Sequence, residues 1–284
     1  MYGIDKPYTL ITGASEGLGK ALAIECASRG MNLILVALPG IELYQLAFYI
    51  RKKYKVLVCE FELDLSKDES CLYLWNSIQQ NNIPVNMLIN NAGLGSTTGF
   101  GESGFETFRK QIELNVMATS RLTHLFLPEL KQHQQSYILN VSSLCVFFYL
   151  QKKQVYGATK SFIYFFSKSL RKEVKKYGTQ VSVLCPGGLI SNPAQYLLNR
   201  SASWIGRSAA MNPEDVAPIA IDGLLRGKER IIPGKWNRFS LLLNKLLPDW
   251  LKNRIASRQM PKLNPQQAAM LLKGTSSESK REAA

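Results

Sequence analysis

The sequence predicts an α/β fold: a Rossmann-type doubly wound parallel sheet of about seven strands, with helices on both faces. Three observations predict it. Short apolar runs alternate along the chain with longer segments of helical periodicity. The run over residues 32–37 (NLILVA) is apolar throughout, as in a strand that is buried on both faces. The first apolar run, residues 8–12 (YTLIT), stops at a cluster of glycines, which is typical of a strand-to-helix turn.

The same pattern places the individual elements. Strands are expected over residues 8–12, 32–37, 56–63, 85–90, 136–142, 179–185 and 229–233. Helices are expected from the glycine cluster to residue 28 and over residues 41–54, 67–80, 105–132, 155–177 and 213–226. Because crossovers between parallel strands are right-handed, this alternation places a ligand crevice at the carboxyl ends of the strands.

The composition is that of a globular protein with a sizeable core. The chain has 284 residues, 46% of them hydrophobic, and a mean hydropathy of -0.08. No apolar run reaches the roughly 18–20 residues of a membrane-spanning helix. Residues 1–8 lack the basic-then-apolar layout of a secretory signal, so a cytoplasmic location is the expected default.

The cysteines and histidines predict no metal site. Five cysteines are scattered without a CxxC pair, and the chain contains only two histidines. Such a set is typical of buried, reduced thiols, and neither a disulfide framework nor a zinc site is expected.

The positive charge is concentrated at the C-terminus. The formal net charge is +14, of which residues 226–284 carry +9 and the preceding 225 residues only +5. A basic tail on an otherwise ordinary domain argues against a nucleic-acid-binding fold. We expect one catalytic domain over residues 1–234, a basic amphipathic extension over 235–264 and a flexible tail over 265–284.

A glycine-rich turn follows the first predicted strand. Glycines at positions 13, 17 and 19 form the pattern T-G-x-x-x-G-x-G at the strand-to-helix junction. Glycines make the turn tight and let the backbone approach a pyrophosphate, and the helix N-terminus then faces the phosphate charge. Such a turn is weak evidence alone, but it is much stronger after the first strand of an α/β alternation.

A tyrosine and a lysine lie four residues apart in a predicted helix. Tyr156 and Lys160 therefore share one face. A free phenol has a pKa of about 10, and a nearby ammonium is expected to lower it toward the range of a useful acid–base. This pairing also occurs by chance on many helices, so it predicts chemistry only in context.

These motifs together resemble the short-chain dehydrogenase/reductase family. The glycine spacing is similar to that of its short, single-domain branch, and Glu16 stands where the extended branch would have glycine. Asn90–Gly93 (NNAG) matches a family stretch after the fourth strand, and Ser143 precedes Tyr156 by the usual thirteen residues. The resemblance covers about residues 8–191, and residues 211–234 also look like this family.

The resemblance implies a hydride transfer between nicotinamide and a carbonyl or alcohol substrate, with Tyr156 as general acid–base. It implies that Lys160 binds the nicotinamide ribose, that Ser143 holds the substrate oxygen and that Asn115 helps hold a water beside Lys160. The catalytic residues expected are Asn115, Ser143, Tyr156 and Lys160. The cofactor-binding residues expected are Gly13, Ser15, Glu16, Gly17, Leu18, Gly19, Ala37, Leu38, Asp64, Leu65, Asn91, Ala92, Gly93, Asn115, Tyr156, Lys160, Pro186 and Gly187. Ser191 stands where the family usually has a threonine after this last pair.

The choice between NAD and NADP stays open at this stage, with a slight lean to NADP. Residues 36–39 (VALP) contain no acid that would bind both ribose hydroxyls, which is the usual NAD device. They also lack an arginine for a 2′-phosphate, since Leu38 stands at that position. Glu16 replaces a basic residue common in NADP enzymes and favours NAD.

Two segments depart from the family pattern. Residues 144–150 (LCVFFYL) replace a small, glycine- and proline-containing stretch, and either form an aromatic wall for an apolar substrate or pack under the neighbouring loop. Residues 235–260 mix Leu, Trp and Phe with Lys and Arg. This extension either packs on the same or a neighbouring subunit, covers the active site, or makes peripheral contact with an anionic membrane. Pro248 interrupts any single helix there.

The helix that carries Tyr156 is too apolar to be fully solvated. Phe162, Ile163, Phe165 and Phe166 follow the motif, and the resemblance implies a homodimer or homotetramer through this helix and the preceding one. The alternative function is a catalytically idle nucleotide-binding or membrane-associated interaction protein on the same fold. Such proteins typically lose the tyrosine or the lysine, and both are present here.

Overall fold

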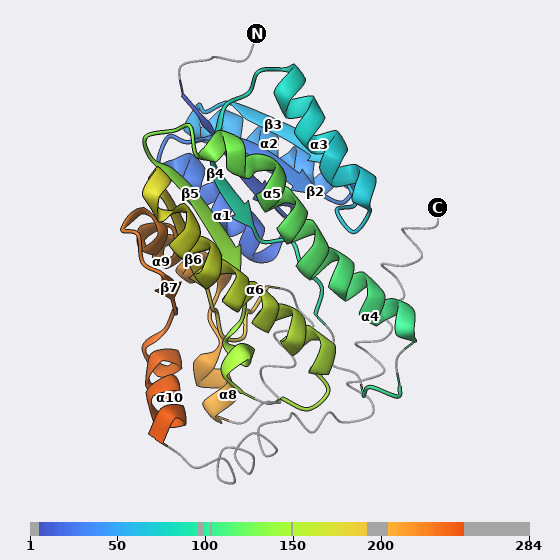
Figure 1. The fold of residues 1–284 in the computed structure, drawn as a ribbon, viewed down its shortest axis with the longest axis vertical. Coiled ribbons are helices and arrows are strands. Elements are labelled where there is room, and N and C mark those ends of the chain that lie inside the picture. Colours follow the sequence, from blue (N-terminus) through green and yellow to red (C-terminus); the bar gives the residue numbers. More distant parts are fainter. Residues whose placement is uncertain (1–5, 96–98, 103, 149, 192–203, 247–284) are drawn as a thin grey trace.

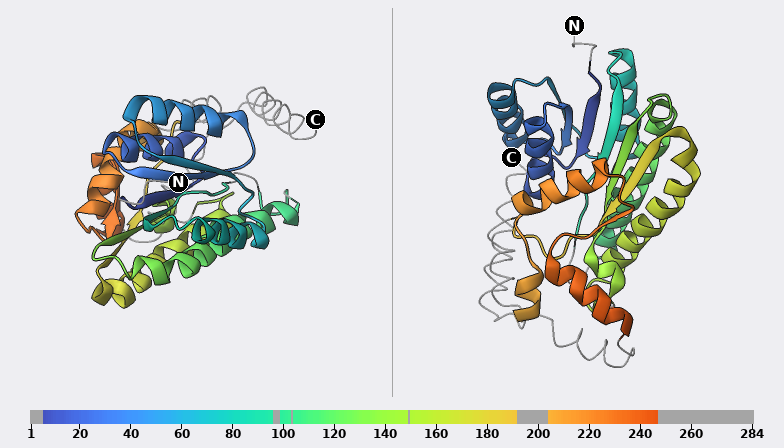
Figure 2. Two further views of the ribbon diagram at one scale, coloured as in Figure 1. Left: turned by 90° about the horizontal axis from the view of Figure 1, so that it is seen from above. Right: turned by 90° about the vertical axis from the view of Figure 1, so that its left-hand side faces the viewer.

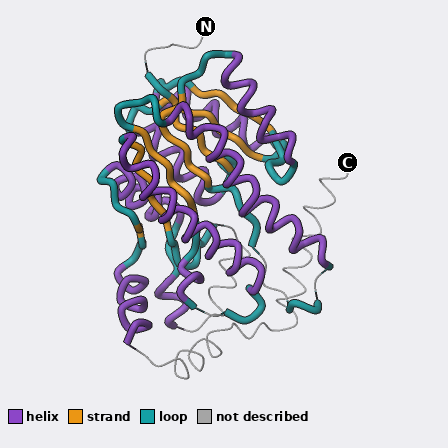
Figure 3. The backbone as a smooth tube through the Cα atoms, in the orientation of Figure 1, coloured by secondary structure: helices purple, strands orange, loops and turns teal. Residues whose placement is uncertain are grey.

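The computed structural model describes residues 6–95, 99–102, 104–148, 150–191 and 204–246. Within them, seven strands form one parallel sheet in the order β3-β2-β1-β4-β5-β6-β7 (Figures 1 and 3). The strands are β1 (Tyr8–Thr12), β2 (Asn32–Ala37), β3 (Val58–Glu62), β4 (Val85–Asn90), β5 (Ser136–Val141), β6 (Thr179–Leu184) and β7 (Arg230–Ile231). The strand order reverses direction between β1 and β4, which is where a doubly wound sheet opens its ligand crevice. The predicted fold class is confirmed.

Helices cover both faces of the sheet (Figure 2). One face carries α1 (Gly17–Ser28), α2 (Ile41–Tyr54) and α9 (Pro213–Leu225), and the other carries α3 (Asp68–Gln80), α5 (Thr119–Leu130) and α6 (Gln154–Val174). The apolar run in β2 explains this arrangement. Its side chains alternate, so Leu33 and Leu35 join the first core while Ile34 and Val36 join the second.

Several short elements gather at the carboxyl ends of the strands (Figure 1). The 3-10 turn η2 (Leu144–Phe147) follows β5, α8 (Trp204–Ala209) comes after β6, and α10 (Lys235–Leu246) follows β7. The helix α10 contacts both α8 and η2. The 3-10 turn η3 (Lys175–Tyr177) is at the other end of the sheet, where it extends α6 and Gly178 leads into β6 in the left-handed conformation. The carboxyl edge is therefore the elaborated end of the molecule.

The long helix expected over residues 105–132 differs from a regular α-helix. It consists of α4 (Phe105–Ile112), the π-helical segment η1 (Glu113–Ala118) and α5, joined without a break. A π turn contains an extra residue, which changes the phase of the helix too briefly for hydrophobic periodicity to reveal it. The widened segment contains Asn115, whose side chain is 1% exposed.

The described part of the C-terminal extension is the helix α10. Asn237 is buried and donates to the carbonyl oxygens of Ala209 (3.2 Å) and Pro233 (2.8 Å). The apolar residues on α10 that are exposed are Trp236, Phe239, Leu242 and Leu243. Membrane contact stays a prediction, and residues 247–264 and the tail 265–284 lie outside the described residues. Among the described helices, none combines the length and apolarity needed to cross a bilayer.

Candidate active site

The glycine turn after β1 leaves room for a ligand at the N-terminus of α1. Gly13 has a φ of 64°, which favours glycine, and a Cβ on Gly19 would lie 1.8 Å from the carbonyl oxygen of Gly13. The α1 helix begins at Gly17 and points its first N–H groups at this turn. Leu18 is buried in the core, so only its backbone can face a ligand, while Ser15 is half-buried and Glu16 is exposed. The turn fits a pyrophosphate.

Side-chain hydrogen bonds join the ends of β1 and β4. The Thr12 hydroxyl accepts the N–H groups of Asn91 and Ala92, both at 3.0 Å. The Asn91 amide donates to the carbonyl oxygens of Thr12 (2.9 Å) and Gly13 (3.1 Å). The NNAG stretch is therefore fixed against the glycine turn, at the point where the strand order reverses.

The edge of the crevice near β2 and β3 contains an acid that sequence reasoning missed. Leu38 is exposed, and the loop after it is held by Glu62, whose carboxylate accepts the Gly40 N–H (2.8 Å) and the Tyr44 hydroxyl (3.0 Å). Glu62 lies opposite Ala37 in the β2–β3 register. It is distant from this loop in sequence, and only strand pairing reveals the contact.

Asp64 and Leu65, which follow β3, have structural roles of their own. One Asp64 oxygen accepts both the N–H (3.0 Å) and the hydroxyl (2.7 Å) of Ser66, which orders the turn into α3. Leu65 is a core residue, with a side chain that is 5% exposed. A contact of this pair with adenine stays a prediction, and for Leu65 only the backbone is available.

Ser143, Tyr156 and Lys160 converge at the carboxyl end of β5. The Ser143 side chain lies close enough to the Tyr156 hydroxyl to lower the pKa of that phenol, against the effect of burial. The Lys160 ammonium lies 6.0 Å from the centroid of the Tyr156 ring and donates to the Val141 carbonyl at 2.8 Å. Ser142 acts in the scaffold, because its hydroxyl donates to the Lys160 carbonyl at 2.8 Å. The structure thus brings the three predicted residues together.

The expected effect of Lys160 on the phenol is not found. Burial raises the pKa of Tyr156, the Cys145 thiol raises it further, and the Ser143 side chain opposes both. Burial also lowers the pKa of Lys160 to about 8. Burial is the largest cause of the pKa shift in both groups, and it disfavours the charged form of each. The protein by itself therefore keeps Tyr156 protonated.

Asn115 ties the loop after β4 to the helix that carries Tyr156. Its side chain accepts the Leu94 N–H (2.8 Å) and donates to the Leu94 carbonyl and the Thr159 hydroxyl, both at 3.0 Å. A Cβ on Gly93 would lie 3.0 Å from the Asn115 oxygen and 3.1 Å from the Lys160 nitrogen. Asn115 is therefore adjacent to the lysine, as predicted, and its role with a water stays a prediction.

The loop after β6 closes the other side of the crevice. The carbonyl of the buried Pro186 accepts the Leu144 N–H at 2.8 Å, and a Cβ on Gly187 would lie 2.4 Å from the Ala209 carbonyl oxygen. A Cβ on Gly17 would lie 3.1 Å from the Cβ of Ser191 and 3.6 Å from its hydroxyl oxygen. Ser191 thus reaches across to the glycine turn, and the two loops border one crevice.

The aromatic segment after Ser143 packs inward at Phe147. The ring of Phe147 meets Tyr164 edge-on at 5.2 Å, and the Arg230 guanidinium lies 5.6 Å from its centroid. These contacts pack Phe147 against α6 and β7 and favour a packing role over a substrate wall at this residue. Phe148 is half-buried, and Tyr149 lies outside the described residues.

Two further residues, Cys145 and Lys153, lie at the site, and no sequence motif predicted them. Cys145 donates its N–H to the Ser143 hydroxyl oxygen at 3.2 Å, and burial raises the pKa of its thiol. Lys153 places its ammonium 5.2 Å from the centroid of the Tyr156 ring. All five cysteines are buried thiols that form no disulfide, as predicted.

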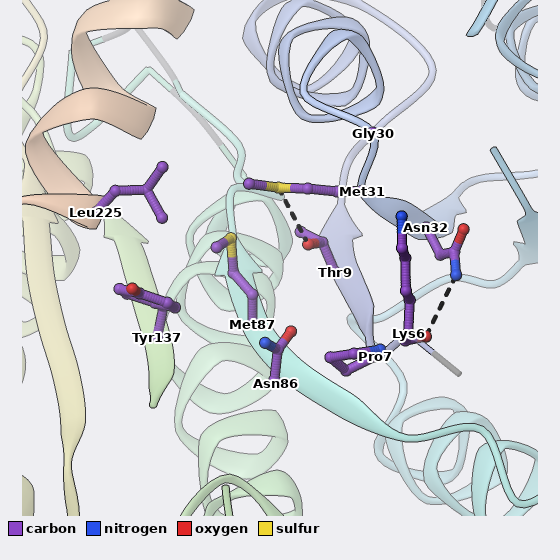
Figure 4. A pocket seen from close by; sticks show the side chains of 10 residues that line it. All are labelled: Lys6, Pro7, Thr9, Gly30, Met31, Asn32, Asn86, Met87, Tyr137 and Leu225. Atoms are coloured by element: carbon purple, nitrogen blue, oxygen red, sulfur yellow. Dashed lines mark hydrogen bonds between the residues drawn. The ribbon is translucent and has the colours of Figure 1, made fainter. Parts of the chain in front are cut away.

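A separate cavity lies at the opposite edge of the sheet. It has a volume of about 210 Å³, and Thr9, Asn32 and Tyr137 lie among its lining residues at the amino ends of the strands (Figure 4). The Thr9 hydroxyl points at the Met31 sulfur (3.8 Å), and the Asn32 amide donates to the Lys6 carbonyl (3.2 Å). The strands separate this cavity from the crevice, so it takes no part in the site.

The arrangement of glycine turn, NNAG stretch and Ser–Tyr–Lys cluster can be compared with known proteins. The short chain dehydrogenase family matches residues 7–200. The chain belongs to this family. The predicted resemblance is confirmed, and the chain is an NAD(P)-dependent oxidoreductase of the short chain dehydrogenase family. The alternative of a catalytically idle protein is not favoured.

Three relatives illustrate the similarity. An oxidoreductase of Staphylococcus saprophyticus is 25% identical over 224 residues, which are 79% of this chain and 93% of that protein. The very-long-chain 3-oxoacyl-CoA reductase of Mus musculus is 30% identical over 187 residues, which are 63% of this chain but only 58% of the mouse protein. The solved short-chain dehydrogenase of Sphingobium yanoikuyae in complex with NADPH is 26% identical, with a TM-score of 0.72, and the match covers 91% of this chain and 98% of that one.

Proposed function

We propose that this oxidoreductase transfers a hydride between NADP(H) and a carbonyl or alcohol carbon, with Tyr156 as the proton-transfer residue. The observation that carries the proposal is the convergence of Ser143, Tyr156 and the Lys160 ammonium at the edge where the glycine turn also lies. When bound, the reduced nicotinamide supplies the hydride, and the protein supplies position and protons.

The residues of the crevice fit a dinucleotide. The backbone around Gly13, Gly17 and Gly19 would hold the pyrophosphate, because a Cβ at Gly19 would collide with the turn. Ser191, which lies beside Gly17, would close over it. Lys160 would hold the nicotinamide ribose, and Pro186–Gly187 would border the nicotinamide.

Tyr156 and Ser143 act on the substrate oxygen. In reduction, the carbonyl oxygen gains negative charge as its carbon receives the hydride, and the Tyr156 hydroxyl donates its proton to that oxygen. Ser143 donates a hydrogen bond to the same oxygen and steadies the charge. Because burial keeps Tyr156 protonated, the protein favours the acid form that reduction requires.

The preference for NADP(H) rests on two supports. The segment Ala37–Pro39 contains no carboxylate to repel a 2′-phosphate, and the Glu62 carboxylate is engaged by Gly40 and Tyr44. The Sphingobium yanoikuyae relative is named as a complex with NADPH. A substrate with an apolar part is proposed from the half-buried Phe148 and the exposed Leu94 beside the crevice.

A homodimer is proposed through α6 and the helix before it. Phe162 is 44% exposed and Phe165 is 67% exposed on α6, and Phe105 and Ile112 are exposed on α4. The helices α4 and α6 lie side by side and both carry exposed apolar side chains, which supports an interface at these helices.

The test compares wild type with Tyr156→Phe. Quenching of tryptophan fluorescence should show tighter binding of NADPH than of NADH, and both proteins should bind NADPH equally. On a panel of apolar ketones and aldehydes, Tyr156→Phe should lower kcat/KM by about 10²–10⁴-fold, because the general acid is lost. Equal turnover by the two proteins would overturn the assignment of Tyr156.

A further inference from the structure

A second lysine flanks the phenol. Tyr156 and Lys160 lie four residues apart on one face of α6, and Lys153 is the residue that immediately precedes this helix. The two ammonium groups lie 5.2 Å and 6.0 Å from the centroid of the Tyr156 ring. The proton-transfer residue is therefore bordered by two cations, and hydride transfer as proposed assigns a task to only one of them.

The two lysines differ in the hydrogen-bond acceptors available to their ammonium groups. Lys160 is 5% exposed and donates to the Val141 carbonyl at 2.8 Å. Lys153 is half-buried, and among the described residues no carboxylate or carbonyl oxygen accepts its protons. Its pKa is lowered by burial, with the Cys145 thiol opposing that effect. A partly desolvated ammonium without an anion is costly, so stability alone does not favour a lysine here.

The surroundings of Lys153 differ from those of Lys160. Lys153 lies near Cys145, whose N–H donates to the Ser143 hydroxyl oxygen at 3.2 Å, and Ser143 is the group proposed to hold the substrate oxygen. Lys160, in contrast, interacts with both Cys145 and Cys185, and Cys185 immediately precedes the Pro186–Gly187 border of the nicotinamide site. Lys153 is thus near the group proposed to hold the substrate oxygen, whereas Lys160 is near the loop proposed to border the nicotinamide.

We propose that Lys153 is a specificity-determining residue that binds an anionic group of the substrate, a carboxylate a few bonds from the reacting carbonyl. The proposal rests on the proposed function and names its substrate class: oxoacids with an apolar part. A carboxylate at this point would supply the missing partner of the ammonium, and a charge-assisted hydrogen bond would orient the carbonyl toward Tyr156 and Ser143.

The test uses the holoenzyme with NADPH and three matched pairs of probes: acetoacetate, levulinate and 5-oxohexanoate, each against its ethyl ester. Wild type should show a higher kcat/KM for the acid than for the ester in at least one pair. Lys153→Met should raise KM for that acid by about 10- to 100-fold and leave the ester unchanged. Lys152→Met is the matched control, because Lys152 is the exposed neighbour, and it should alter neither value.

Thermal unfolding separates recognition from a structural role. Without substrate, Lys153→Met should melt at or above the temperature of wild type, because an unpaired ammonium is removed. A lower melting temperature together with equal losses on acid and ester would assign Lys153 to structure and overturn the proposal. Wild type that reduces other carbonyls but prefers the ester in every pair would also overturn the proposal. Wild type that reduces other carbonyls but none of the six probes would do the same. In both cases the proposed hydride transfer would stand. The absence of turnover on any carbonyl would refute the proposed function itself.

Discussion

At the scale of single residues, the site shows a conflict between stability and chemistry. Lys160 is buried among β5, α6 and the loop after β4, and its ammonium has one backbone acceptor, the Val141 carbonyl. Burial lowers its pKa from 10.5 to about 8, so the folded protein holds the charged form at a cost. A residue that weakens the fold is retained where the proposed chemistry needs a cation.

Lys160→Met is expected to abolish activity and to stabilise the fold. Below pH 8 lysine is charged in both states and the full penalty applies, which is about 3 kcal/mol for this shift. Between pH 8 and 10.5 the unfolded chain binds the proton more tightly, so the penalty fades as pH rises. Urea unfolding should therefore show Lys160→Met more stable than wild type at pH 7, with the gap narrowing toward pH 10.

The test compares the free energy of unfolding of Lys160→Met with that of wild type at each pH, because the cysteines of both proteins also titrate. Burial raises the pKa of Cys26 to about 12, so the stability of both proteins falls as pH rises above 9. A Lys160→Met protein less stable than wild type at pH 7 would show that the lysine is paired more favourably than its burial indicates.

At the scale of elements, the site depends on segments that sequence periodicity does not describe. The alternation of apolar runs predicted the strands and most helices to within a few residues, because burial on both faces imposes the pattern directly. The π-helical segment around Asn115 and the short helix α8 escaped it, since neither is long enough to show a period. The motifs located Asn115 correctly, but its partners Leu94 and Thr159 became known only from the fold.

Asn115→Leu keeps the side-chain volume nearly unchanged and should destabilise the loop after β4. The change removes three hydrogen bonds, and the free energy of unfolding should fall by about 1–3 kcal/mol. KM for NADPH should rise, because Gly93 and the Lys160 nitrogen lose the side chain against which they are placed. Denaturant unfolding and steady-state kinetics measure both effects.

Ser120→Ala provides the control for Asn115→Leu. Ser120 lies five residues further along the same helix, and its buried hydroxyl has no hydrogen-bond partner, so its removal should leave stability unchanged. Equal stability of Asn115→Leu and Ser120→Ala would mean that the asparagine side chain does not hold the loop.

At the scale of the whole molecule, the family motifs and the fold agree, but the outer surfaces were harder to anticipate. The order of β1, β4, β5 and β6 brings the glycine turn, NNAG, Ser143 and Pro186–Gly187 to one edge, as the alternation predicted. The contact between Glu62 and the loop after β2 depends on strand register, and the position of Lys153 depends on how η2 leads into α6. Neither follows from spacing along the chain.

The exposed faces of α4 and α6 predict the oligomeric state. Phe165→Glu places a charge in the proposed interface, and light scattering should show a shift from dimer to monomer. Phe48→Glu is the matched control, because Phe48 is 65% exposed on α2, on the other face of the sheet, and should leave the mass unchanged. A monomeric wild type, or a Phe165→Glu protein with unchanged mass, would contradict the interface.

The most direct measurement follows deuterium from the cofactor to the product. NADPH deuterated at the transferring position of C4 is incubated with the protein and the best ketone of the panel, and the alcohol is examined by mass spectrometry. The account predicts one deuterium on the carbinol carbon for each NADPH oxidised, and almost no labelled alcohol with Tyr156→Phe. Alcohol without deuterium, or equal labelling by Tyr156→Phe, would contradict it.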